Sequence, residues 1–286
     1  MSFLIFSILC SSAINWIFVL YKKYTIQTIV AIPFNYLICS LLSHYFFGSF
    51  IYSIPSFSNP AFLPATFLGV LFIIIFYAMA KTTQLFGVAI NVVSSKMAMI
   101  IPVIFFIFYS NQQLNSIAFI GIIIALFAIL CINSSAYKVK GNGRNVWYPI
   151  LVFIGSGIID TSLKLMEITY LNYKSPFFIT TAIFSSAFII GISAIFVQGK
   201  TKITPRDVLA GALLGIPNFC SILFFLFALK ELQQWHAGQI FAVNHCSIIV
   251  ISSLGGVVFF KESFSKLQIA GLCLGVLSIV CMLYAF

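Results

Sequence analysis

The sequence predicts an all-α integral membrane protein of about ten transmembrane helices. Hydrophobic residues fill 62% of the 286 positions and charged residues only 7%, so a soluble fold could not cover its core with a polar surface. Apolar spans long enough to cross a hydrocarbon layer of about 30 Å recur along the whole chain, each needing roughly 20 residues. These spans are apolar all round, which favours helices over the alternating strands of a membrane barrel.

The spans follow one another closely, so no soluble domain is expected. In order they cover residues 1–20, 26–47, 62–79, 88–108, 117–136, 148–168, 177–197, 208–229, 238–260 and 267–286. The first span is expected to be a helix rather than a signal peptide, because no basic segment precedes it and Lys22 and Lys23 follow it.

Composition also limits the function classes. The seven cysteines all lie in apolar spans without a C-x-x-C pair, so they predict neither a metal site nor a cofactor. The net charge of +10 does not indicate nucleic acid, because basic residues at helix ends interact with lipid head groups. The absence of H-E-x-x-H and phosphate-loop motifs argues against an enzyme.

The charges of the connections predict the orientation in the membrane. Eleven of the fifteen Lys and Arg residues lie in odd-numbered connections, against only Lys174 and Lys230 in even-numbered ones. Loops rich in Lys and Arg usually lie on the cytoplasmic side of the cell (plasma or inner) membrane. The odd connections are therefore expected in the cytoplasm and both termini on the outer side. The basic segment 137–146 is then a cytoplasmic linker, and the uncharged segment 48–61 an external loop.

The two halves of the chain show a weak internal repeat. A shift of 150 residues aligns 76–131 with 226–281 without a gap and sets the polar junction Asn111–Gln112 on Lys261–Glu262. We therefore expect two five-helix repeats, residues 1–136 and 147–286. Because five is odd, the second repeat enters the membrane from the opposite side, an inverted arrangement that places transporter sites near the midplane, between the halves.

The closing segment FFKESFSKLQIAGLCLGVLSIVCMLYAF resembles the end of EamA-like proteins of the drug/metabolite transporter superfamily. The matching residues are Glu262, Gln268, Gly271 and Gly275. The resemblance implies ten helices in two inverted halves and a central cavity lined mainly by helices 1, 3, 4, 6, 8 and 9. It implies a class of transporter and no particular substrate. The chain departs from the family pattern in carrying Gln112 in the first half and in lacking a proline within the ninth span.

The sixth span carries the clearest polar stripe. Ser156, Asp160, Lys164 and Glu167 share one helix face by their spacing, and Asp160 is expected to pair with Lys164 one turn away. One interpretation is a neutral structural pair, with Lys164 and Glu167 reaching to the membrane boundary. The other is a stripe that faces a cavity.

The fourth, eighth and ninth spans add further polar groups. Lys96 is the preferred substrate contact, although a structural pair with an acid of the sixth span is an equal alternative. Asn91 lies roughly 140° around the same helix from Lys96. His245 either binds substrate or carries a proton, or it makes an interhelical hydrogen bond. Pro217 predicts a kink that exposes backbone beside Asn218. The candidate substrate-binding residues are Lys96, Asp160, Lys164, Asn218, Asn244, His245, Asn91, Tyr77, Asn15 and Ser156.

These observations favour a secondary transporter that moves a small organic solute, amino acid-like, metabolite or drug, by alternating access. A channel or a membrane enzyme acting on lipid substrates is the alternative, although no ring of pore-lining charges is present. Proton coupling requires that Asp160 or His245 titrate, whereas facilitated exchange needs no titrating group. The sequence leaves the coupling ion, the direction of transport and the oligomeric state open.

Overall fold

The structure is a computed structural model that describes residues 1–47, 60–86, 88–110, 116–132, 147–170, 176–198, 202–235, 237–260 and 265–284. These residues form helices joined by short turns, and no strand occurs among them. The predicted all-α class is confirmed. The linker 137–146, the loop 48–59 and the motif residues Gln112 and Glu262 lie outside the described residues.

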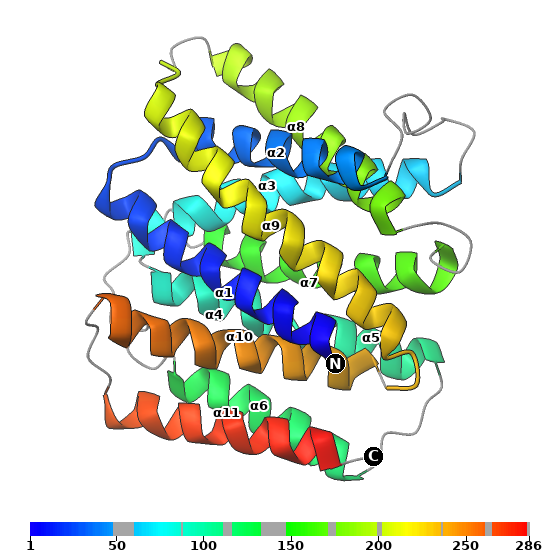
Figure 1. The fold of residues 1–286 in the computed structure, drawn as a ribbon. Helices are drawn as coiled ribbons and strands as arrows, with labels where there is room; N and C mark the ends of the chain where they lie inside the picture. Colours follow the sequence, from blue (N-terminus) through cyan, green and yellow to red (C-terminus); the bar gives the residue numbers. More distant parts are fainter. Residues whose placement is uncertain are drawn as a thin grey trace. The chain divides into compact units, whose positions relative to one another are not determined.

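Every predicted span contains helix (Figure 1). The helices are α1 (Ser2–Lys23), α2 (Thr28–Phe47), α3 (Phe62–Phe86), α4 (Val88–Met97), α5 (Ile100–Ser110), α6 (Ser116–Ile132), α7 (Trp147–Tyr170), α8 (Pro176–Gln198), α9 (Pro205–Glu231), α10 (Ala237–Phe260) and α11 (Lys266–Tyr284). Seven of them are long and apolar enough to cross a membrane, and three shorter apolar helical segments accompany them in the described parts of the chain. The protein is therefore a multi-pass membrane protein, while the ten-helix inverted repeat stays a prediction.

The chain forms two compact units, and each takes helices from both predicted repeats. Unit 1 comprises residues 1–80 and 162–231, and unit 2 comprises 81–161 and 232–286. Two boundaries fall within α3 and α7, and the third follows the end of α9. The predicted repeats describe sequence similarity, so these units neither support nor overturn them.

In unit 1, α2 packs against α8 and α9, and α1 packs against α9 (Figure 1). Glycines of α9 allow the closest approach between α9 and α2. A Cβ atom at Gly211 would lie 2.2 Å from the Ala31 carbonyl oxygen, and one at Gly215 would lie 2.7 Å from the Asn35 carbonyl oxygen. The Gly211/Gly215 pair thus lets α9 lie against α2, as small residues commonly do between membrane helices.

Asp207 connects the beginnings of two helices of unit 1. Its carboxylate accepts hydrogen bonds from the Thr204 hydroxyl at 2.6 Å and from the backbone N–H of Gln27 at 2.8 Å. Asp207 stands in the first turn of α9, where backbone N–H groups and the helix dipole favour a negative charge. Because Gln27 directly precedes α2, one buried carboxylate holds the first turn of α9 beside the beginning of α2.

In unit 2, α6 packs along α11, and α10 contacts α4, α5, α6 and α11 (Figure 1). The Ser278 hydroxyl of α11 donates a hydrogen bond to the Gly121 carbonyl of α6 at 2.8 Å. Such a bond keeps a hydroxyl satisfied where hydrocarbon offers no partner. Because α10 contacts α4, α5, α6 and α11, its polar side chains lie among helices of unit 2.

The fourth span is broken, which the sequence did not predict. We expected one helix over 88–108, but α4 ends at Met97 and α5 begins at Ile100. Pro102 is the physical reason, because it lacks an N–H and its ring clashes with the carbonyl four residues earlier, that of Ala98. The Ala98 carbonyl instead accepts the Ile101 N–H at 3.0 Å, in a tighter turn. The chain thus interrupts a membrane helix one turn before Pro102.

Candidate substrate-binding site

Polar side chains of unit 2 gather on three helices that are otherwise apolar. They are Asn91, Ser95 and Lys96 of α4, Ser156 and Asp160 of α7, and Asn244 and His245 of α10. Asn91, Asn244 and His245 are at most 6% exposed. A polar group buried at membrane depth is costly unless it contacts protein partners, water or a ligand, so these groups form the candidate site.

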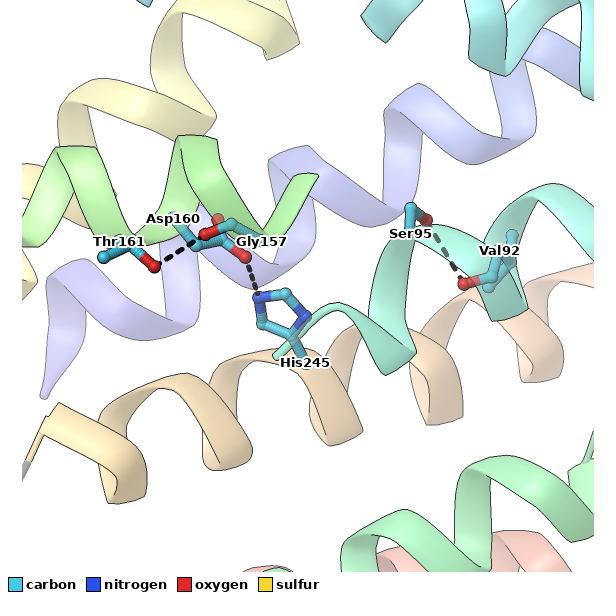
Figure 2. A network of polar contacts seen from close by, with 6 residues as sticks. All are labelled: Val92, Ser95, Gly157, Asp160, Thr161 and His245. Atoms are coloured by element: carbon cyan, nitrogen blue, oxygen red, sulfur yellow. Dashed lines mark hydrogen bonds and ion pairs between the residues drawn. The ribbon is translucent and has the colours of Figure 1, made fainter. Parts of the chain in front are cut away.

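Asp160 and His245 face each other from α7 and α10 (Figure 2). The His245 Nε2 atom lies 3.1 Å from Asp160 Oδ2, and the two side chains are 4% and 16% exposed. Our expectation that Asp160 pairs with Lys164 was wrong. The physical reason is that the short Asp160 side chain meets a partner on the neighbouring helix, while the Lys164 ammonium turns to Glu167.

Several atoms of this cluster lack hydrogen-bond partners among the described residues. They are Asp160 Oδ2, His245 Nδ1, Asn91 Oδ1 and Asn244 Oδ1. The Asp160–His245 contact is therefore close, although it lacks the geometry of a hydrogen bond. An unsatisfied buried polar atom costs about 1–3 kcal/mol, and four in one region of one unit indicate a place that accepts a polar ligand or water.

Lys96 supplies the positive charge of the cluster. It stands in the last turn of α4, directly before the interruption at Ala98 and Met99, and it is half-buried. A cation at a helix C-terminus interacts favourably with the exposed carbonyls. No ion pair joins Lys96 to Asp160 among the described residues, so both interpretations of Lys96, a structural pair and a substrate contact, stay predictions.

The helix that carries Asp160 packs directly against the broken span. A Cβ atom at Gly157 would lie 2.4 Å from the Ile101 side chain, so only glycine allows this approach. Thr161 donates its hydroxyl to the Gly157 carbonyl at 2.7 Å, which satisfies that hydroxyl within α7 (Figure 2). The turn of α7 before Asp160 therefore lies on the first turn of α5, next to the interruption.

Comparison with known proteins identifies the second half of the chain. The model of the EamA-like transporter family matches residues 146–284. Residues 146–284 are thus similar to the EamA-like transporter family. The resemblance predicted from the closing residues is confirmed, and the match is consistent with a member of the drug/metabolite transporter superfamily. The EamA family indicates a membrane transporter of small solutes rather than an enzyme.

Two whole-chain similarities accompany the EamA match. An uncharacterised protein of Haemophilus influenzae (strain KW20) is 27% identical over 293 aligned positions, which cover 98% of this chain and 97% of that protein. A solved crystal structure of another protein matches with a TM-score of 0.75 at 13% identity, over 98% of this chain and 94% of that one. At this identity the second similarity shows the fold alone.

The EamA-like segment supplies only part of the cluster. Asp160, Asn244 and His245 lie within it, whereas Asn91 and Lys96 lie before it. The cation of the candidate site therefore comes from a part of the chain that the family model does not match.

The other candidate residues lie in unit 1. Lys164 forms an ion pair with Glu167 on the same helix, 2.5 Å between Nζ and Oε2, and the side chains are 7% and 1% exposed. Both side chains are buried and paired with each other, and their position relative to the membrane boundary stays a prediction. Asn15 is buried and Tyr77 half-buried, both with polar or aromatic contacts in the structure.

Asn218 belongs to a small polar network of unit 1. Its Nδ2 donates to Asn35 Oδ1 at 3.1 Å, and both residues are at most 1% exposed. The Cys39 thiol donates to the Gly215 carbonyl at 3.2 Å. The α9 helix continues through Pro217 from Pro205 to Glu231. Sequence reasoning missed Asn35, although a lone amide within the apolar span 26–47 was the signal that could have found it.

Proposed function

We propose that this protein is a secondary transporter that moves a small polar organic solute, of amino acid-like, metabolite or drug character, by alternating access. The solute binds at the cluster of Lys96, Asp160 and His245 in unit 2. The observation that carries this proposal is the set of ionisable groups within membrane helices, of which His245 is buried and Lys96 and Asp160 are partly buried. Each such group costs about 2.5–3.5 kcal/mol at the centre of a span on insertion scales, so the cluster persists where a function requires it.

The broken fourth span supports alternating access. Transporter sites are commonly built at interrupted helices, where the two helical segments can move separately. Here the interruption at Ala98 and Met99 directly follows Lys96. A change of the backbone at these two residues would reorient the α4 segment with its ammonium group, while α5 stays packed against Gly157.

Contacts in unit 1 support the proposed orientation. The Arg206 guanidinium donates to the Tyr24 carbonyl at 2.7 Å, which brings two odd-numbered connections to one end of the unit. The Met1 amino group lies 2.7 Å from Glu231, which brings the first residue together with an even-numbered connection. These pairings suit odd connections in the cytoplasm and even connections, with both termini, on the outer side of the cell inner membrane.

A ligand screen followed by uptake tests this function. The purified protein is heated with a library of amino acids, organic acids and drugs, since a ligand that binds the folded state raises its apparent stability. Stabilising solutes are then measured for uptake into proteoliposomes. We expect saturable uptake that Lys96→Ala abolishes and that Lys164→Met with Glu167→Met retains. Uptake without saturation would instead indicate a channel.

A further inference from the structure

The end of α1 and the beginning of α9 bring two cations to one aromatic ring of unit 1 (Figure 1). The Arg206 guanidinium donates a hydrogen bond to the Tyr24 carbonyl at 2.7 Å and lies 5.9 Å from the centre of the Tyr24 ring. The Lys23 ammonium lies 5.7 Å from the same ring centre. All three residues are exposed. Two like charges are therefore held beside one ring, although they come from distant parts of the sequence.

Two further cations lie beside this pair. Lys22 precedes Lys23 in the last turn of α1. The Gln27 Nε2 atom lies 3.5 Å from the Lys202 carbonyl oxygen, which brings Lys202 to the same end of the unit. Both lysines are exposed. The four cations form one group, which we call the basic corner: Lys22, Lys23, Lys202 and Arg206.

The acids of unit 1 do not balance the basic corner. Residues 20–30 and 202–212 contain one acid, Asp207, which is 3% exposed and already accepts hydrogen bonds from Thr204 and from the Gln27 backbone. The other two acids of the unit, Glu167 and Glu231, have ion-pair partners elsewhere. Four cations against one buried carboxylate leave an excess of three positive charges.

An exposed apolar face of α9 leads away from the basic corner. Leu209, Leu213 and Ile216 follow Arg206 at three, seven and ten positions, so all four residues share one face of the helix. The three apolar side chains are 61%, 58% and 52% exposed. On a membrane helix such a face contacts lipid acyl chains, because hydrocarbon is its solvent. A cationic end joined to a lipid-facing strip matches an amphiphile with an anionic head.

We propose that the basic corner is a binding site for an anionic phospholipid. The phosphate group lies between Lys23 and Arg206 beside the Tyr24 ring, where the guanidinium and ammonium groups can donate charge-assisted hydrogen bonds to its oxygens. The acyl chains lie along Leu209 and Leu213. The lipid comes from the leaflet at the odd-numbered connections, which the charge pattern predicts to be cytoplasmic and which carries anionic lipids.

The bound lipid has a structural consequence for unit 1. Without it, the cations at the end of α1 and the beginning of α9 repel one another, and the phosphate neutralises part of that repulsion. The lipid thus fastens the two helices together at this end. The site lies in unit 1, whereas the candidate solute cluster lies in unit 2, so this inference does not depend on the solute that the protein carries.

The test is thermal unfolding of the purified full chain in dodecyl maltoside, with dioleoyl phosphatidylglycerol, dioleoyl phosphatidylcholine or inorganic phosphate added in turn. A ligand that binds the folded state raises its apparent stability. We expect phosphatidylglycerol to raise the unfolding temperature far more than the other two additions. In Lys23→Gln with Arg206→Gln, the phosphatidylglycerol concentration that gives the same rise should increase at least about tenfold.

A matched variant separates the basic corner from general attraction between a positive protein and a negative lipid. Lys230→Gln with Lys266→Gln removes the same number of charges from exposed positions elsewhere and should keep the full response. If the variant of Lys23 and Arg206 does not fold, Lys22→Gln with Lys202→Gln replaces it. That variant lowers the charge of the corner, leaves the hydrogen bond of Arg206 in place, and should also weaken the response.

Three results would overturn the proposal. An equal response in the variants of the corner and in the matched variant would show that net charge alone attracts the lipid. Equal stabilisation by phosphatidylcholine would show that the acyl chains act without recognition of the anionic head. Equal stabilisation by inorganic phosphate would identify a site for a free anion in place of a lipid. Each of these results would leave the proposed transport function as it stands.

Discussion

The α7 helix takes part in two polar pairs that begin four residues apart, and they differ in how their partners are arranged. Lys164 and Glu167 stand three residues apart on one helix, so movement between helices cannot separate them. Asp160 meets His245 of another helix, and atoms of both residues lack hydrogen-bond partners among the described residues. We call Lys164–Glu167 the closed pair and Asp160–His245 the open pair. The comparison teaches that a closed pair suits a structural role, whereas an open pair can exchange partners with a solute.

The largest effect is expected from a variant that breaks the closed pair of Lys164 and Glu167. Lys164→Met leaves the Glu167 carboxylate buried without its cation, so we expect the free energy of unfolding to fall by about 3–5 kcal/mol. The double variant Lys164→Met with Glu167→Met should recover most of that loss, because it removes both charges. Unfolding in mixed micelles with increasing SDS measures both values. A double variant as unstable as the single one would contradict a simple structural pair.

The open pair should behave in the opposite way. Asp160→Asn removes the negative charge of the cluster, and we expect solute affinity to fall by about 3 kcal/mol, roughly a hundredfold. Stability should change less than in Lys164→Met, because His245 can remain neutral. Equilibrium binding of the solute found by the screen measures the first effect and SDS unfolding the second. Unchanged affinity in Asp160→Asn would place the solute elsewhere.

The amide pair of unit 1 extends the comparison to uncharged groups. Asn218→Ala removes the donor at 3.1 Å from Asn35 Oδ1, which should lower the free energy of unfolding by about 1–3 kcal/mol. Solute affinity should stay the same, because both amides lie in unit 1. Asn244→Ala in unit 2 is the matched variant, and it should show the reverse: a loss of affinity with little loss of stability.

The smallest expected effect concerns the broken span. Pro102→Ala restores an N–H and removes the ring that crowds the Ala98 carbonyl, so the fourth span can form a continuous helix. We expect the transport rate to fall by about threefold to tenfold, equivalent to about 1 kcal/mol, with solute affinity nearly unchanged. Ser252→Ala, at the aligned position of the continuous α10, serves as the control. A Pro102→Ala protein with the normal rate would show that the interruption does not move.

Hydropathy and length were sufficient to predict where helix occurs among the described residues, because each crossing needs a long apolar segment whatever its neighbours. They did not predict the interruption between α4 and α5. The partners of the polar side chains could not be predicted in this way. Spacing along one helix predicted Lys164 as the partner of Asp160, whereas in the structure Asp160 lies next to His245 of α10. Pro102 was visible in the sequence, yet whether a membrane proline kinks or breaks a helix depends on the packing around it.

The most direct test of the central claim is a crystal structure of the protein, grown in a lipid phase, with the transported solute bound. The account predicts solute density in contact with the Lys96 ammonium and next to Asp160, Asn244 and His245, with the Lys164–Glu167 pair unchanged. Density beside Lys164, or against the Asn35–Asn218 pair of unit 1, would contradict the assignment of the substrate site to unit 2.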